Sequence, residues 1–129
     1  MRRIASIVFV LASALIAFGA LGHDSNAAKL HAEFAKFPAL DAGTVAIVIA
    51  VWHFCSGCMA VLGLICLGAW WRATRHGERH VFIASDLIGT FYVIVGVASV
   101  LYTGRPFFWV FTVLGAALIL ASLPLRRAG

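Results

Sequence analysis

The stretch "AGTVAIVIAVWHFCSGCMAVLGLICLGAWW", residues 42–71, decides the fold of this protein. It contains no Lys, Arg, Asp or Glu over its whole length. A helix needs ~20 apolar residues to cross a hydrocarbon core ~30 Å thick, so this stretch is longer than one crossing requires. A longer helix can tilt or project beyond the bilayer. We therefore predict a transmembrane helix over residues 43–71.

Three further apolar runs, at residues 4–22, 81–104 and 106–125, also reach spanning length and contain a single charged residue, Asp86. The chain is 63% hydrophobic and 12% charged, against ~45–50% and ~25% in soluble domains. This composition excludes a soluble globular protein, because so much apolar surface could not be buried. Short loops between successive helices favour neighbours that run in opposite directions. The sequence predicts one all-α membrane domain over residues 1–129, an antiparallel four-helix transmembrane bundle.

The first apolar run permits a second interpretation. Arg2 and Arg3, the run itself and the small residues "SNA" at 25–27 resemble a secretory signal sequence with its cleavage site. However, the run has 19 residues, whereas the apolar core of a signal sequence has ~7–15. We therefore favour a retained membrane span over a cleaved signal.

The basic residues lie in small groups between the apolar runs, which argues against nucleic-acid binding despite the net charge of +5. Seven of the ten flank one side of the predicted membrane and three flank the other. The first set is Arg2, Arg3, Arg72, Arg75, Arg79, Arg126 and Arg127, and the second is Lys29, Lys36 and Arg105. Because Lys and Arg are enriched in cytoplasmic segments, we predict cytoplasmic N- and C-termini. The expected location is a bacterial inner membrane, with the lipid bilayer as partner.

The first outer loop contains a short helical pattern, "AAKLHAEFAKF" at residues 27–37. Leu30, Phe34 and Phe37 share one helical face, and Pro38 ends the pattern. This spacing predicts an amphipathic helix on the outer membrane surface. We expect it to cap the bundle; the alternative is a lid over a cavity that opens outward.

His53 is an ionisable residue deep inside the second run. It lies ten residues from Gly43, so a helical rise of 1.5 Å per residue places it ~15 Å into the span. Ionisable residues at such depth are costly and mark functional sites by default. Small residues on its side of the helix predict that His53 points into the bundle, against a matching stripe on the third run. These stripes are Ala46, Ala50, Gly57 and Ala60, and Ser85, Gly89, Val93 and Gly96. His53 would then bind a ligand or form a structural hydrogen bond to a residue such as Ser99.

Cys55 and Cys58 form a C-x-x-C motif, a pattern that indicates redox chemistry in other settings. On a helix they lie ~60° apart and nearly opposite His53, so the three residues cannot converge on one metal ion. Apolar surroundings disfavour the reactive thiolate, which favours a packing role over a redox pair. Vitamin K epoxide reductase–type enzymes combine four spans with a C-x-x-C, but they also need cysteines in an outer loop, which this chain lacks. No family is assigned.

A second group of polar side chains is expected outside the membrane. His23, His31 and Glu33 are chemically suited to bind first-row metals, and with His53 they would form an outward-facing metal or haem site. His31 and Glu33 are two residues apart, so on one helix they point in different directions. A haem or metal cofactor is therefore an alternative that the spacing does not favour.

Asp86 is the single acidic residue inside an apolar run. Charged residues within membrane helices usually pair with one another. We expect Asp86 to form an ion pair at the inner rim with one of four residues: Arg72, Arg75, Arg79 or His80.

The sequence contains no nucleotide-binding glycine loop, no G-x-S-x-G and no H-E-x-x-H motif, so we favour a non-enzymatic role. We expect a binding or interaction module for a partner protein, a lipid or a hydrophobic small molecule, with a membrane protein or a second copy as further partner. The candidate ligand-binding residues are His53, Glu33, His31 and Ser99. The alternative is a membrane redox, haem- or metal-handling protein that uses His53 with the outer-loop residues, or Cys55 with Cys58.

Overall fold

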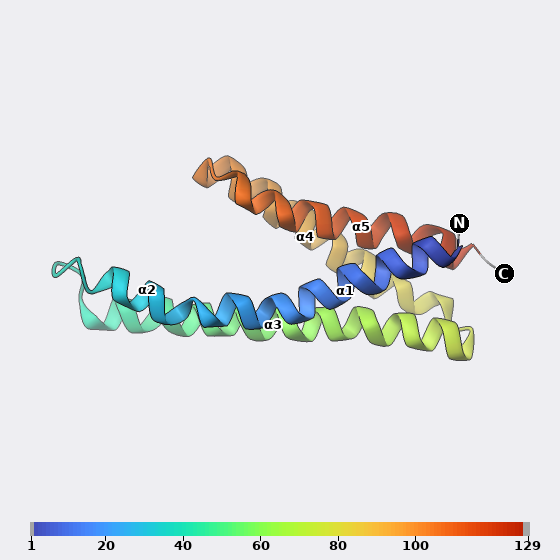
Figure 1. Ribbon diagram of the computed structural model, residues 1–129, viewed down its shortest axis with the longest axis horizontal. Helices are drawn as coiled ribbons and strands as arrows, with labels where there is room; N and C mark the ends of the chain where they lie inside the picture. Colours follow the sequence, from blue (N-terminus) through green and yellow to red (C-terminus); the bar gives the residue numbers. More distant parts are fainter. Residues whose placement is uncertain (1, 128–129) are drawn as a thin grey trace.

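The computed structural model describes residues 2–127, and every regular element within this range is helical. In chain order these elements are α1 (Arg2–Ser25), α2 (Ala27–Phe34), α3 (Ala42–His76), the 3-10 turn η1 (Arg79–Val81), α4 (Phe82–Thr103), the 3-10 turn η2 (Pro106–Phe108) and α5 (Trp109–Arg126). Four segments are long and apolar enough to cross a membrane: Arg2–Phe34, Ala42–His76, Arg79–Thr103 and Pro106–Arg126. They match the four predicted runs, except that the third ends at Thr103 and not at residue 104, and this confirms the all-helical class. The start of α1 and the end of α5 lie at the same end of the molecule (Figure 1).

Local signals in the sequence set the ends of α3 and α4. Asp41 caps the start of α3, because the backbone N–H of Thr44 donates to its Oδ1 over 2.9 Å. The hydrogen bonds from Thr44 stabilise the carboxylate and lower the pKa of Asp41. The two helices end at Gly77 (φ 73°) and Gly104 (φ 67°), and glycine adopts this left-handed conformation without a steric penalty.

We predict that Asp41→Ala accelerates hydrogen–deuterium exchange in the first turn of α3, because the Thr44 amide loses its acceptor. Acid should have the same effect. The pKa of Asp41 is lower in the folded protein than in the unfolded chain, so the cap contributes fully above the ordinary value of ~3.9. This contribution is lost as the pH falls through the folded pKa. Mass spectrometry of the exchanged protein checks the variant, with Asp41→Asn as a control that keeps a capping oxygen. Identical exchange in all three proteins would rule out the cap.

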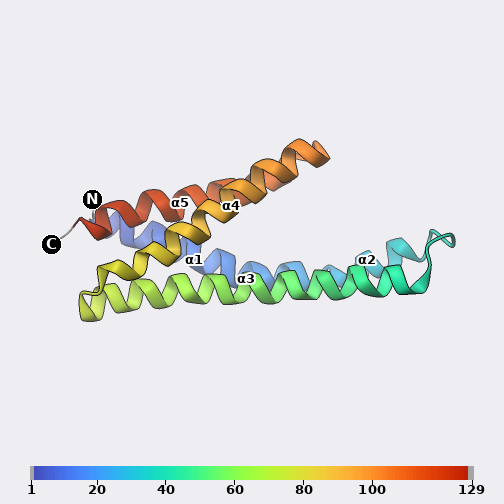
Figure 2. The same ribbon diagram turned by 180° about the vertical axis from the view of Figure 1, so that it is seen from behind.

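The four long segments form two hairpins, one of α1 with α3 and one of α4 with α5 (Figure 2). In the first hairpin, Trp70 Nε1 donates to Ser6 Oγ over 2.6 Å. Further along, a Cβ added to Gly63 would lie 2.4 Å from the backbone nitrogen of Ala17. Such close approach of two backbones needs a residue without a side chain. The sequence therefore builds the α1–α3 hairpin around Gly63.

The α4–α5 hairpin corrects the predicted partner of the small residues on the third run. A Cβ on Gly89 would lie 2.8 Å from the carbonyl oxygen of Gly115, and one on Gly96 would lie 2.3 Å from Thr112 Oγ1. Both contacts are with α5, whereas we expected them with α3. On α3, a Cβ on Gly57 would meet nothing within 4 Å. The short turn through Gly104 places α4 beside α5, so the small-residue stripe on α4 packs there first.

The two hairpins meet in a core near the end that holds the start of α1. Phe9 and Phe82 are buried and pack edge to face with their ring centroids 5.2 Å apart. Ile16, Cys66 and Leu118 are also fully buried in this core. Toward the other end, the α4–α5 hairpin diverges from the α1–α3 hairpin, which both ribbon views show (Figures 1 and 2). We call the end where the hairpins pack together the closed end, and the end where they diverge the open end.

Asp86 forms the expected ion pair, but its partner is not one of the predicted residues. Arg126 Nη1 lies 2.6 Å from Asp86 Oδ2, and Ser122 donates its hydroxyl to Asp86 Oδ1. Arg72, one of the predicted partners, pairs with Glu78 instead. The end of α5 lies beside the beginning of α4. Arg126 is therefore the basic residue that reaches Asp86, in place of the predicted residues that precede α4.

The predicted outer-loop helix is present as α2. It continues the line of α1 along α3 instead of crossing the end of the bundle (Figure 1). It therefore does not cover the open end, as a cap or a lid would.

Candidate functional site

The end of α1 is fixed to α3 by a polar contact around His23. Trp52 Nε1 donates to the backbone oxygen of His23 over 2.7 Å. His23 Nδ1 lies 2.8 Å from Ser56 Oγ, and the His23 and Trp52 rings stack with centroids 4.0 Å apart. These contacts hold the two helices together beside the opening between the hairpins.

His53 does not point into the bundle, contrary to the prediction. Its Nδ1 lies 2.6 Å from Asp24 Oδ1, and the two side chains are 51% and 49% exposed. The prediction failed because α1 continues past Gly22 to Ser25, so that an acidic side chain reaches the level of His53. The face of α3 that carries His53 therefore lies against the last turn of α1 and not against α4.

The outer residues proposed as ligands lie apart from His53. Glu33 pairs with Lys36 over 2.6 Å, and both side chains are more than 60% exposed. His31 lines a separate pocket beside Phe37 and the turn into α3. Within residues 2–127, no three His, Cys, Asp or Glu side chains gather in a way that could hold a metal ion. The structure thus does not bring His53, His31 and Glu33 to one site.

An apolar cleft of ≈ 340 Å³ lies between the two hairpins. It brings together four of the predicted candidates: Cys55, Cys58, Ser99 and, from the end of α1, His23. The rest of the lining is aromatic and aliphatic: Phe54, Met59, Leu62, Phe91, Tyr92, Val95, Phe108 and Phe111. Both cysteines are free thiols; Cys55 is exposed and Cys58 is half-buried. Their position opposite His53 around α3 agrees with the helical geometry expected from the sequence.

Tyr92 is a lining residue that sequence reasoning missed. It is only 4% exposed, and its hydroxyl has no hydrogen-bond partner in the described chain. Its ring packs against Phe91 and Phe111 with centroid distances of 6.0 and 5.9 Å. A buried hydroxyl without a partner costs free energy. The signal for it was present in the sequence, because Tyr92 is the tyrosine in the middle of a span, whereas Tyr102 lies near a span end.

A groove of ≈ 500 Å³ adjoins the cleft. It shares Phe54, Cys58, Leu62 and Phe91 with the cleft and extends over Gly57 and Val61. Since a Cβ at Gly57 would meet nothing within 4 Å, the missing side chain keeps this groove open. The cleft and the groove therefore adjoin each other along α3 and α4.

No protein family, curated protein or solved structure matches this chain. The cleft itself offers van der Waals contact with aromatic and aliphatic side chains and a small number of polar groups. This combination is typical of sites that bind hydrophobic small molecules.

Proposed function

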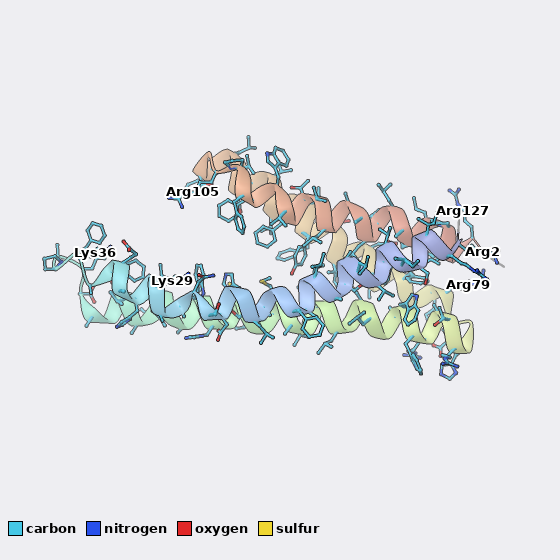
Figure 3. All side chains as sticks on the ribbon, in the orientation of Figure 1. Arg2, Lys29, Lys36, Arg79, Arg105 and Arg127 are labelled. Carbon is cyan, nitrogen blue, oxygen red and sulfur yellow. The ribbon has the colours of Figure 1, made fainter. Side chains whose placement is uncertain are left out.

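We propose that the four helices cross a bacterial inner membrane as an antiparallel bundle with cytoplasmic termini. The distribution of charge supports this placement: Arg2, Arg79 and Arg127 lie at one end, and Lys29 and Arg105 lie at a similar level toward the other (Figure 3). From Arg2 to Lys29 the helical rise gives ~40 Å. A bilayer with its headgroups is ≈ 40–45 Å thick.

With this placement, the cleft lies in the outer leaflet of the membrane. Tyr92 lies thirteen residues from both Arg79 and Arg105, so it falls ~20 Å from each end and near the middle of the membrane. Ser99 lies ~10 Å further out along α4. His53 and Asp24 fall close to the outer headgroups, where two ionisable side chains are tolerated more easily than in hydrocarbon.

We propose that the protein binds a hydrophobic small molecule or lipid in this cleft. The observation that carries the proposal is the lining itself, which combines aromatic and aliphatic walls with few polar groups. Its volume of ≈ 340 Å³ falls in the range of 300–1,000 Å³ typical of ligand sites. The core near the termini keeps the hairpins joined while the outer half stays open for a ligand.

The thiol of Cys55 offers a direct test, because it is exposed and lines the cleft. In nanodiscs, tridecylbenzene is expected to slow the alkylation of Cys55 severalfold, since a bound molecule covers the thiol. Alkylation is followed by mass spectrometry in a variant that keeps only this cysteine.

The matched control is Leu64→Cys in a cysteine-free background. Leu64 lies on the same helix, is 61% exposed and does not line the cleft. Equal slowing at both positions would show that the probe only dissolves in the bilayer, and the proposed function would then be wrong.

A further inference from the structure

The hydroxyl of Tyr92 is a buried hydrogen-bond donor that has no acceptor in the described chain. Tyr92 is one of the residues that line the apolar cleft. At the proposed depth near the middle of the bilayer, water is not available to accept its proton, and lipid tails carry no acceptor. A ligand that brings an oxygen atom to this position would remove the cost of the unpaired hydroxyl.

The adjoining groove supplies a path for the rest of such a ligand. It leads from the shared residues Phe54 and Phe91 over Gly57, where no side chain fills the space. The groove has almost no polar lining atoms, since its residues are Phe54, Gly57, Cys58, Val61, Leu62 and Phe91. A hydrocarbon tail fits these walls.

We infer that the cleft binds a neutral lipophile whose head carries a carbonyl oxygen that accepts a hydrogen bond from Tyr92, and whose tail leaves over Gly57 into the bilayer. This inference rests on the proposed function. A neutral acceptor is favoured over a charged one, because a charge is costly at this depth and no Lys or Arg side chain lines the cleft. The flat walls of Phe91 and Phe111 suit an aromatic head. Binding in this way requires the Tyr92 side chain, which lines the cleft, to turn its hydroxyl toward the bound oxygen.

Two probes that differ only in the carbonyl oxygen test the inference: 1-phenyltridecan-1-one and tridecylbenzene. The chain has two tyrosines, so labelling with [¹³Cζ]tyrosine gives separate signals for Tyr92 and Tyr102 in nanodiscs. The ketone is expected to shift the Tyr92 signal, and the hydrocarbon is expected to leave it unchanged. Tyr102 is 93% exposed and serves as the internal reference.

Tyr92→Phe removes only the unpaired hydroxyl, so the fold should be kept. Its affinity for the ketone is expected to fall about tenfold, toward that of the hydrocarbon, as the loss of one hydrogen bond implies. Gly57→Leu should block the tail path and weaken the binding of both probes. Gly68→Leu is the matched control on α3, because a Cβ at Gly68 also meets nothing within 4 Å and this residue lines neither the cleft nor the groove.

The outcomes separate the inference from the function on which it rests. If neither probe protects Cys55, the proposed function itself is wrong. If both probes protect Cys55 but the ketone leaves Tyr92 unshifted and Tyr92→Phe binds both equally, the cleft takes plain hydrocarbon and the carbonyl inference is overturned. If Gly57→Leu binds both probes as Gly68→Leu does, the tail does not leave over Gly57.

Discussion

Replacement of Gly115 by leucine is expected to separate α4 from α5 and to cost more than about 3 kcal/mol of unfolding free energy. A Cβ at this position would lie 2.3 Å from the carbonyl oxygen of Gly89 and 2.8 Å from the backbone nitrogen of Val93. Both atoms belong to the α4 backbone, so no side-chain rotation relieves the overlap. Helices in membranes associate through close packing and not through the hydrophobic effect, so the contact cannot be replaced elsewhere. Unfolding of the purified protein in mixed micelles, followed by circular dichroism, measures the change.

Gly68→Leu is the control for this measurement, because it adds the same side chain to a long apolar helix at a position where a Cβ meets nothing within 4 Å. Its unfolding free energy should stay close to that of the parent protein. Equal losses in the two variants would mean that leucine disturbs insertion or helix propensity, and that the Gly89–Gly115 contact does not hold the hairpin together.

The four long apolar helices could be predicted from the sequence, because the capacity of a segment to cross a membrane depends on its own length and composition. Residues 42–71 carry no formal charge, and α3 covers them as Ala42–His76. The same argument holds for α4, whose predicted range of 81–104 differs from Phe82–Thr103 by one residue at each end. Nothing about neighbouring helices is needed for these assignments.

The position of His53 could not be predicted in the same way, because it depends on how two helices align. The predicted depth of His53 was counted along α3 from Gly43, whereas its surroundings in the structure depend on the contact of α3 with α1. The pairs Asp24–His53 and Ser6–Trp70 have residue numbers that add to 77 and 76, as expected for two helices of equal rise that fold back near Pro38. A sum near these values would have placed Asp24 at the level of His53, once α1 and α3 were known to pair.

The small-residue stripe on α4 shows a related limit. Gly89 and Gly96 correctly indicated a close helix contact, but a stripe of small residues does not indicate which helix packs against it. The candidate site was predictable where it depended on a single helix, since Cys55 and Cys58 lie away from His53 as the helical period requires. Its cleft could not be predicted, because it arises from the divergence of two hairpins.

Replacement of Phe9 by alanine is expected to loosen the junction between the hairpins, at a cost of about 3 kcal/mol, as large-to-small changes in buried cores do. Phe9 is 0% exposed and packs edge to face on Phe82, so its removal leaves a void at the closed end. The matched control is Phe18→Ala on the same helix; Phe18 is 69% exposed and would exchange protein surface for lipid contact at little cost. Unfolding in mixed micelles compares the two variants. Equal losses would show that the lipid-facing surface stabilises the fold as much as the core does. A loss confined to Phe9→Ala would locate the stability at the closed end, which leaves the open end free to admit a ligand.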